Sequence, residues 1–304
     1  MYIGIDLGGT KITAGIADAS GKILRQETVK TDKSNDPQKV IQQLSDLAKD
    51  LAAGQNVKIG IGIPGQVKDG KVINMPNLPQ LNGVDLVQKL KERFPAEYII
   101  ENDANVAALA ELKYGAGKGY KNFIYVTVST GIGGGIIING DLYTGANGTA
   151  GEFGHTIIMP DGPLCGCGNK GCWEALGSGT ALAKMAEAKI ASGAADGLKE
   201  LAKDKPINVE LLVEAAKQGD AEALELLEVN AYFNALGLTN LVHAFDPEVI
   251  IIGGGLSFNG DYFFQPLLKI MKMFKLLNPQ NSIEVLPAGC KQDSGLLGAI
   301  SLTI

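Results

Sequence analysis

The feature that most constrains the fold of this chain is a pattern that occurs twice. A strand, a glycine-rich turn and a second strand are predicted over residues 2–17, and the same succession returns over residues 123–138, where the glycine turn is expected at 130–135. Each copy leads through a tight turn into another short strand, at residues 22–24 and 142–143. Such repetition indicates an internal duplication. The sequence therefore predicts an α/β protein with two similar lobes, each of which presents a glycine turn to a cleft between them.

A second glycine pattern has to be separated from these turns. Gly60, Gly62 and Gly65 match the spacing of a dinucleotide-binding loop, in which the second and third glycines begin a helix. Here Gly60 and Gly62 lie within an apolar strand that Pro64 ends, and a hairpin is expected over residues 67–72. We therefore do not predict a Rossmann site.

Composition narrows the class of protein. A chain of 304 residues suggests two domains, and a net charge of −6 argues against a broad nucleic-acid footprint. The N-terminal stretch lacks the basic and apolar segments of a signal peptide, and no apolar run approaches the ~20 residues that span a bilayer. Clustered cysteines without a secretion signal indicate a reducing compartment. We expect a cytoplasmic protein without membrane partners.

Three of the four cysteines lie in one glycine-rich stretch, residues 151–174, together with one of the two histidines. The spacing is C-x-C-x4-C over Cys165, Cys167 and Cys172, and His155 precedes them. Thiolates and a neutral imidazole suit tetrahedral zinc, and four such ligands close a structural site. A disulfide is the alternative, but three clustered cysteines would leave one unmatched. We therefore predict a structural zinc site.

The same stretch carries two acids, Glu152 and Glu174. A zinc ion would hold both carboxylates and His155 in one rigid loop, where they can exchange hydrogen bonds with a polyol. The loop is therefore a candidate sugar-binding site.

Phosphate chemistry is suggested by the two glycine turns. The backbone N–H groups that can cradle phosphates belong to Gly8, Gly9 and Thr10 in the first turn, and to Thr130, Gly131 and Gly133 in the second. Asp6 can hold magnesium through water. Asp103 lies where a strand ends and a helix begins, so it either caps that helix or accepts a proton from a reacting hydroxyl. This combination suggests phosphoryl transfer to a sugar.

The second half of the chain is expected to be mainly helical over residues 179–245. Its predicted core positions are Leu224, Leu227, Ala231, Leu238 and Leu241. A buried strand at 248–252 ends in Gly253, Gly254 and Gly255, which permit close approach of a nucleotide base or ribose; a simple tight turn is the alternative. An apolar helix at 295–299 is expected to pack against either lobe.

Four ordered motifs resemble the signatures of the ROK family of sugar kinases and related repressors. They are DLGGTK at 6–11, ENDAN at 101–105, GEFGH at 151–155 and CGCGNKGCWE at 165–174. The resemblance covers essentially the whole chain. It implies an actin-like ATPase fold, which is a duplicated ribonuclease-H-like fold with an inter-lobe cleft, and it implies ATP, Mg2+ and structural Zn2+ as cofactors.

The resemblance also implies roles for individual residues. Asp103 would be the general base. The zinc ligands would be His155, Cys165, Cys167 and Cys172. The sugar would contact Gly65, Asn77, Asn102, Asp103, Glu152, His155 and Glu174. The nucleotide would lie at Asp6, Gly8, Gly9, Thr10, Lys11, Thr130, Gly131, Gly133, Gly253, Gly254 and Gly255.

Within the family, residues 162–169 are most similar to bacterial glucokinases, so phosphorylation of glucose at the 6-hydroxyl is expected. Similar glucokinases usually carry a tryptophan where this chain has Leu81, which leaves N-acetylglucosamine or N-acetylmannosamine kinase as alternatives. A non-catalytic sugar-responsive regulator is a further alternative, against which Asp103 argues. The repressor branch carries a helix-turn-helix ahead of the first hairpin, whereas five residues precede Asp6 here, so DNA binding is disfavoured.

The expected domains follow from these assignments. Residues 1–115, joined by the C-terminal helix at about 295–304, would form the first lobe. Residues 116–294 would form the second lobe, with the zinc-binding loop at 151–174. We expect a homodimer or homotetramer, and the sequence leaves the preferred sugar, the phosphoryl donor and regulation open.

Overall fold

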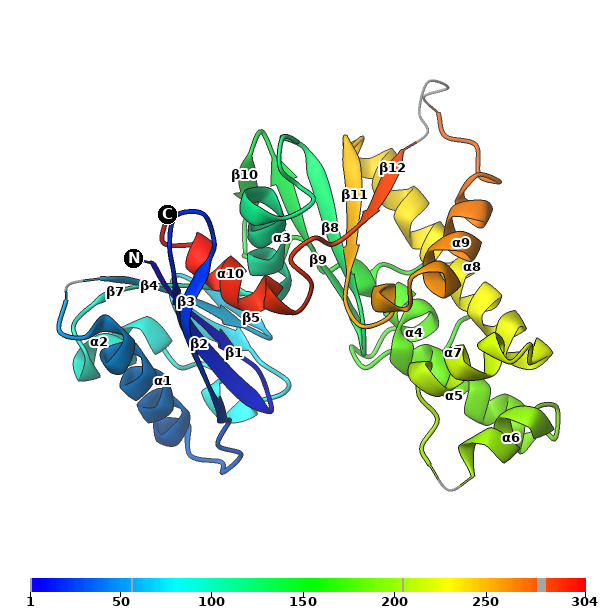
Figure 1. Cartoon of the computed structure of the whole chain (residues 1–304), viewed down its shortest axis with the longest axis horizontal. Helices are drawn as coiled ribbons and strands as arrows, with labels where there is room; N and C mark the ends of the chain where they lie inside the picture. The colour runs from blue at the N-terminus through cyan, green and yellow to red at the C-terminus, as the bar shows by residue number, and fades with distance from the viewer. Residues whose placement is uncertain (1, 56, 204, 278–282) are drawn as a thin grey trace. The chain divides into compact units, whose positions relative to one another are not determined.

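The computed structural model describes residues 2–55, 57–203, 205–277 and 283–304 (Figure 1). The chain forms two compact units. Unit 1 comprises Met1–Tyr125, Gly135–Gly151 and Ala288–Ile304, and unit 2 comprises Val126–Gly134 and Glu152–Pro287.

Unit 1 is built on a five-stranded sheet with the order β3-β2-β1-β4-β7. Its strands are β1 (Tyr2–Leu7), β2 (Lys11–Ala17), β3 (Ile23–Lys30), β4 (Lys58–Ile63) and β7 (Glu97–Asn102). The first three strands are antiparallel, whereas β1, β4 and β7 run parallel. The carboxyl ends of these parallel strands therefore meet at one edge of the sheet, as binding sites in α/β proteins commonly require.

Helices α1 (Pro37–Ala52) and α2 (Leu86–Arg93) pack beside this sheet. The pair Asp36–Pro37 is typical of a helix start, and α1 does begin there: Asp36 caps the helix by accepting from the Gln38 N–H, and Pro37 is its first residue. The apolar residues at helical spacing in α1 are all buried, at Val40, Ile41, Leu44, Leu47, Ala48 and Leu51. Between the two helices lie the predicted hairpin, β5 (Gln66–Lys68) and β6 (Lys71–Asn74), and the short helix η1 (Pro79–Leu81).

The C-terminal helix α10 (Ser294–Ser301) packs within unit 1, against β1, β4 and α3 (Asp103–Tyr114). A Cβ at Gly60 would overlap with the Ala299 carbonyl, so the glycines of β4 admit a helix at close range. The G-x-G-x-x-G spacing thus serves packing and not a dinucleotide. The chain reaches α10 through η4 (Lys291–Asp293), ahead of which the buried Glu111 carboxylate accepts from the Gly289 and Cys290 N–H groups, at 2.9 and 2.8 Å.

A second five-stranded sheet has the order β10-β9-β8-β11-β12. Its strands are β8 (Phe123–Val128), β9 (Ile132–Ile138), β10 (Asp141–Tyr143), β11 (Val249–Gly253) and β12 (Glu284–Pro287). In chain order this is the arrangement of the first sheet, which confirms the duplicated fold. One boundary was predicted wrongly: residues 133–135 lie inside β9, because the glycine turn is shorter than its composition suggested.

The remaining helices belong to unit 2. They are α4 (Trp173–Gly177), α5 (Gly179–Ala191), α6 (Asp196–Ala202), α7 (Val209–Lys217), α8 (Ala221–Phe245) and α9 (Asp261–Met271), with η2 (Phe153–His155) and η3 (Ser257–Asn259). Four of the five predicted core positions of this region are buried, but Leu224 is 45% exposed. Among the described residues, no helix is long and apolar enough to cross a membrane.

Candidate active site

The predicted site residues fall into two sets, one within each unit. The unit 1 set gathers at the edge where β1, β4 and β7 end. Asp6 of β1 lies opposite Gly62 of β4, which in turn lies opposite Glu101 of β7. Paired residues of neighbouring strands therefore connect Asp6 with Glu101, which lies two residues before the start of α3.

Asn102 and Asp103 occupy different positions at the start of α3. Asn102 is the N-cap, and its Oδ1 accepts from the Ala104 and Asn105 N–H groups at 2.9 and 3.2 Å. Its Nδ2 donates to the Gly65 carbonyl at 3.1 Å, which ties two predicted sugar-binding residues together. Asp103 is the first helical residue and is exposed, so the alternative in which Asp103 itself caps the helix is wrong. Its carboxylate stands beside the cap, where the positive end of the helix dipole favours negative charge.

The glycine turn between β1 and β2 is closed by a bond from the Gly8 N–H to the Lys11 carbonyl, at 2.9 Å. Thr31, the residue after β3, stabilises this turn, because its hydroxyl donates to the Gly8 carbonyl at 2.7 Å. Asn77 packs on the turn, since a Cβ at Gly9 would come within 2.9 Å of the Asn77 Cβ. The structure therefore brings a predicted sugar residue against a predicted phosphate turn.

Asp6 is a largely buried acid. Burial raises its pKa above the ordinary value, and the positive charge of Lys11 acts in the opposite direction. Its neighbour in α10 is Gly295, where a Cβ would lie 2.5 Å from Asp6 Oδ2. Gly295 was not among the residues predicted for this site. The signal available was a glycine opening an apolar helix, but nothing in the sequence indicates which strand that helix covers.

In unit 2, two glycine-containing turns lie side by side. The turn after β8 is closed by a bond from the Ser129 N–H to the Gly131 carbonyl at 2.9 Å. The turn after β11 meets the end of β8, because the Leu256 N–H donates to the Val128 carbonyl at 3.0 Å. Gly254 has φ 86°, and a Cβ there would come within 2.5 Å of the same carbonyl. The structure thus brings Thr130 and Gly131 near residues 253–255, whereas Gly133 lies further along β9.

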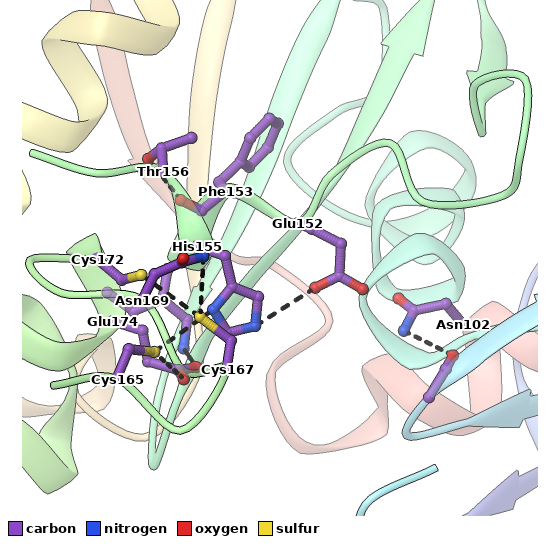
Figure 2. Close-up of polar contacts among 12 residues, drawn as sticks. Asn102, Glu152, Phe153, His155, Thr156, Cys165, Cys167, Asn169, Cys172 and Glu174 are labelled. Carbon is purple, nitrogen blue, oxygen red and sulfur yellow. Dashed lines mark hydrogen bonds and ion pairs between the residues drawn. The ribbon is translucent and has the colours of Figure 1, made fainter. Parts of the chain in front are cut away.

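The four predicted metal ligands form one cluster (Figure 2). The donor atoms of His155, Cys165, Cys167 and Cys172 all lie within 4.8 Å of one another. Cys165 Sγ is 3.6 Å from His155 Nδ1, and the Sγ atoms of Cys167 and Cys172 are 3.6 Å apart. Zinc–sulfur bonds of about 2.3 Å in a tetrahedron place neighbouring sulfurs about 3.8 Å apart. The donor set and its spacing therefore fit a zinc ion.

The surroundings of the cluster suit metal binding as well. Glu152 Oε2 lies 4.0 Å from His155 Nε2, the ring nitrogen opposite the one that faces the cysteines. A carboxylate is a common neighbour of the second ring nitrogen of a metal-binding imidazole, although 4.0 Å is longer than a hydrogen bond. Burial raises the pKa of Cys172 to about 12 and also raises the pKa of Cys165. Because an ion must displace these protons, metal affinity should rise with pH.

Glu174 makes a backbone contact in addition to its predicted role in sugar binding. Its Oε2 accepts from the Ile132 N–H at 2.9 Å, and its Oε1 lies 4.0 Å from Cys165 Sγ. The carboxylate thus lies between the cluster and the turn after β8 (Figure 2). No spacing signal could have revealed this contact, because 42 residues separate its partners.

Two sheets of one strand order, each with a glycine turn after its leading strand, define the actin-like ATPase fold. The chain belongs to the ROK family, whose family model matches residues 2–304.

Characterised relatives share this full-length match. The chain is 37% identical to a glucokinase of Streptomyces coelicolor and 33% identical to an N-acetylmannosamine kinase of Escherichia coli, and each match covers 99% of this chain and 97% of the relative. A ROK family glucokinase from Streptomyces griseus, solved in complex with glucose and AMPPNP, superposes with a TM-score of 0.84 at 35% identity, covering 99% of this chain and 98% of that one.

Proposed function

We propose that this protein is an ATP-dependent hexose kinase that transfers a phosphoryl group to the 6-hydroxyl of glucose. The glucokinases among its relatives support the substrate and the donor. The observation that carries the proposal is the start of α3, where Asn102 caps the helix and the Asp103 carboxylate is exposed beside it, with Oδ1 accepting from the Ala104 N–H at 2.8 Å.

Asp103 is the general base in this proposal. A phosphoryl transfer with a loose transition state needs a carboxylate that positions the attacking hydroxyl and accepts its proton late. Asn102, Gly65, Asn77, Glu152, His155 and Glu174 would bind the sugar hydroxyls. The two glycine turns and residues 253–255 would hold the nucleotide, with backbone N–H groups directed at phosphate oxygens.

The proposal includes two metal ions, one for the reaction and one for the structure. Magnesium, which neutralises charge on the transferred phosphates in this reaction class, would be held by Asp6 through water. Its buried carboxylate, with Lys11 close enough to act on it, is suited to a charged partner. A structural zinc would be bound by His155, Cys165, Cys167 and Cys172.

N-acetylmannosamine is the second candidate substrate, because a relative that phosphorylates it is 33% identical to this chain. Leu81, which stands where similar glucokinases usually carry tryptophan, does not decide between the two sugars. Its side chain is fully buried in the core of unit 1 and presents no surface to a ligand. A coupled kinase assay across glucose, mannose, fructose and the N-acetylhexosamines would identify the sugar, and turnover of none of them would contradict the proposal.

A cytoplasmic location and a homodimer or homotetramer are further parts of this proposal. The lobe boundaries at 115/116 and 294/295 stay predictions, whereas the compact units change at Tyr125/Val126 and Pro287/Ala288, with Gly135–Gly151 belonging to unit 1.

Substitution of the base tests the mechanism. Asp103→Asn is expected to retain sugar binding and lose kcat by roughly 10²–10⁴-fold, the usual contribution of a general base. Calorimetry with glucose and the coupled assay would measure the two effects separately. Asp69→Asn, an exposed acid at the tip of the β5–β6 hairpin, is the matched control and should be unaffected. Near-normal turnover of the Asp103 variant would remove this residue from the role.

Metal analysis tests the zinc site. We expect about one zinc per chain in the purified protein and a large loss in Cys167→Ala, because a structural site needs all four ligands. Cys290→Ala is the control, since Cys290 lies in unit 1 beside Glu111 and contributes nothing to the cluster. Equal zinc content in both variants would contradict the ligand assignment.

A further inference from the structure

The structure links the metal cluster to the turn after β8 through one side chain. We propose that Glu174 is a positioning residue that transmits metal occupancy to the Ser129–Ile132 turn, so that a loaded cluster strengthens nucleotide binding in the absence of sugar. This inference rests on the proposed function, in which that turn holds phosphate. It differs from the sugar-binding role of Glu174, because it acts through the backbone of another segment.

The contact with the turn is direct. Glu174 Oε2 accepts from the Ile132 N–H at 2.9 Å, and a Cβ at Gly131 would overlap with the same oxygen. A carboxylate makes a stronger acceptor for a backbone N–H than a neutral group does. By holding this N–H, Glu174 fixes the peptide between Gly131 and Ile132, and with it the direction of the turn that the Ser129–Gly131 bond closes.

Glu174 is close to the cluster both in the sequence and in space. Cys172 is the N-cap residue of α4, and Glu174 is the second residue of that helix. Glu174 Oε1 lies 4.0 Å from Cys165 Sγ. An ion bound by the four ligands would join η2, the loop and the start of α4 into one closed unit, and would thereby restrict the backbone that carries Glu174.

Trp173, which lies between Cys172 and Glu174, is anchored without metal. The Trp173 indole N–H donates to Asn234 Oδ1 of α8 at 3.0 Å, in a fully buried contact. Trp173 also donates its backbone N–H to Thr156 at 2.9 Å. Loss of the ion should therefore loosen the metal-binding loop and the Glu174 side chain beside Cys165 without unfolding α4. The turn would lose its acceptor while the rest of unit 2 keeps its structure.

Hydrogen–deuterium exchange of the full-length protein tests this link directly, in the absence of sugar and nucleotide. The Ile132 amide is expected to exchange at least about fivefold faster after zinc is removed with a chelator. Glu174→Ala should show fast exchange with or without zinc. Glu174→Gln should keep most of the wild-type protection and its zinc dependence, because its amide oxygen can still accept from Ile132, though more weakly than a carboxylate does. Asp161→Ala, which removes an exposed acid of the same loop, is the matched control.

Calorimetry with AMPPNP, again without sugar, measures the consequence. Chelation should weaken AMPPNP binding by roughly fivefold or more in the wild type, within the usual range of coupling between two sites. In Glu174→Ala the affinity should be low already and insensitive to chelation. Ile132 exchange that ignores both zinc and Glu174 would overturn the inference, and so would equal AMPPNP affinity in all forms. Absence of AMPPNP binding from every form would instead refute the proposed kinase, while the exchange data would still decide whether metal and turn are linked.

Discussion

The two glycine turns that follow β1 and β8 hold equivalent places in sheets of the same strand order, yet each obtains its acid differently. In β1 the penultimate residue is Asp6, so the strand itself carries the carboxylate. The penultimate residue of β8 is Thr127, and the carboxylate at that turn is Glu174, from the segment behind the metal cluster. Duplication preserved the backbone, whereas the source of negative charge diverged.

The difference has a physical consequence. An acid borne by a strand is held by the ladder of backbone hydrogen bonds on both sides, and in Asp6 this rigidity comes with burial. An acid borrowed from a distant segment is held only as well as that segment is folded. The first turn should therefore be insensitive to the cluster, and the second should depend on it.

The largest expected effect comes from removing the strand-borne acid. Asp6→Asn should lower kcat by roughly 100-fold or more, because a magnesium-holding charge contributes several kcal/mol to stabilisation of the transition state. Thr127→Ala, at the equivalent position of the second sheet, should lower kcat by less than about threefold, because it removes no charge. Titration of magnesium in the coupled assay would check both. Similar losses in the two variants would end the distinction between the turns.

The same Asp6 substitution should act on stability in the opposite direction. An acid whose pKa is raised in the folded chain stabilises the fold below its ordinary pKa, and that contribution is lost as pH rises through the raised pKa. At pH 7 the ionised Asp6 therefore costs stability, and Asp6→Asn should raise Tm in magnesium-free buffer. The gain should shrink on acidification, and a lower Tm at pH 7 would contradict it.

An intermediate effect is expected from a matched pair of glycine substitutions. Gly131→Ala introduces a Cβ that overlaps with Glu174 Oε2, so it should displace the borrowed acid and raise the KM for ATP about tenfold, because small misplacements at a reacting site are costly. Gly9→Ala brings its Cβ within 2.9 Å of the Asn77 Cβ and must shift one of the two residues, but it displaces no acid, so its effect on the KM for ATP should be smaller. Steady-state kinetics would separate them, and the reverse order would place the sensitive turn in unit 1.

The smallest effect concerns the reactivity of the thiols. A cysteine of the candidate metal cluster in unit 2 should react faster than the buried cysteine of unit 1. In zinc-stripped protein iodoacetamide should modify Cys167 first, because it is exposed and the Asn169 backbone N–H lowers its pKa. Cys290 should react slowly up to pH 9, since burial raises its pKa to about 12. Peptide mass spectrometry would follow the order, and zinc should protect the cluster thiols. Early labelling of Cys290 would show that its site opens.

Much of this molecule could be predicted from local pattern. Apolar periodicity and the Asp36–Pro37 pair located α1, and the spacing of three cysteines and a histidine identified a cluster whose donors do converge. The wrong predictions were made where the residue types alone do not specify the local conformation or burial. Glycines at 133–135 were predicted as a turn but continue β9, and Leu224 was predicted as core but is exposed, because an apolar residue on a long helix is buried only where another element covers it.

The sequence by itself determined the duplicated strand–turn–strand units, the candidate metal-binding cluster of one histidine and three cysteines, and the residues at the start of α3, since each depends on residues close together in the chain. Only the tertiary structure decided that Gly295 lies on Asp6, that Asn102 rather than Asp103 caps α3, and that Glu174 bonds to Ile132. The reason is physical: a short-range pattern specifies local conformation, whereas contacts between distant segments depend on how helices and loops pack against a sheet.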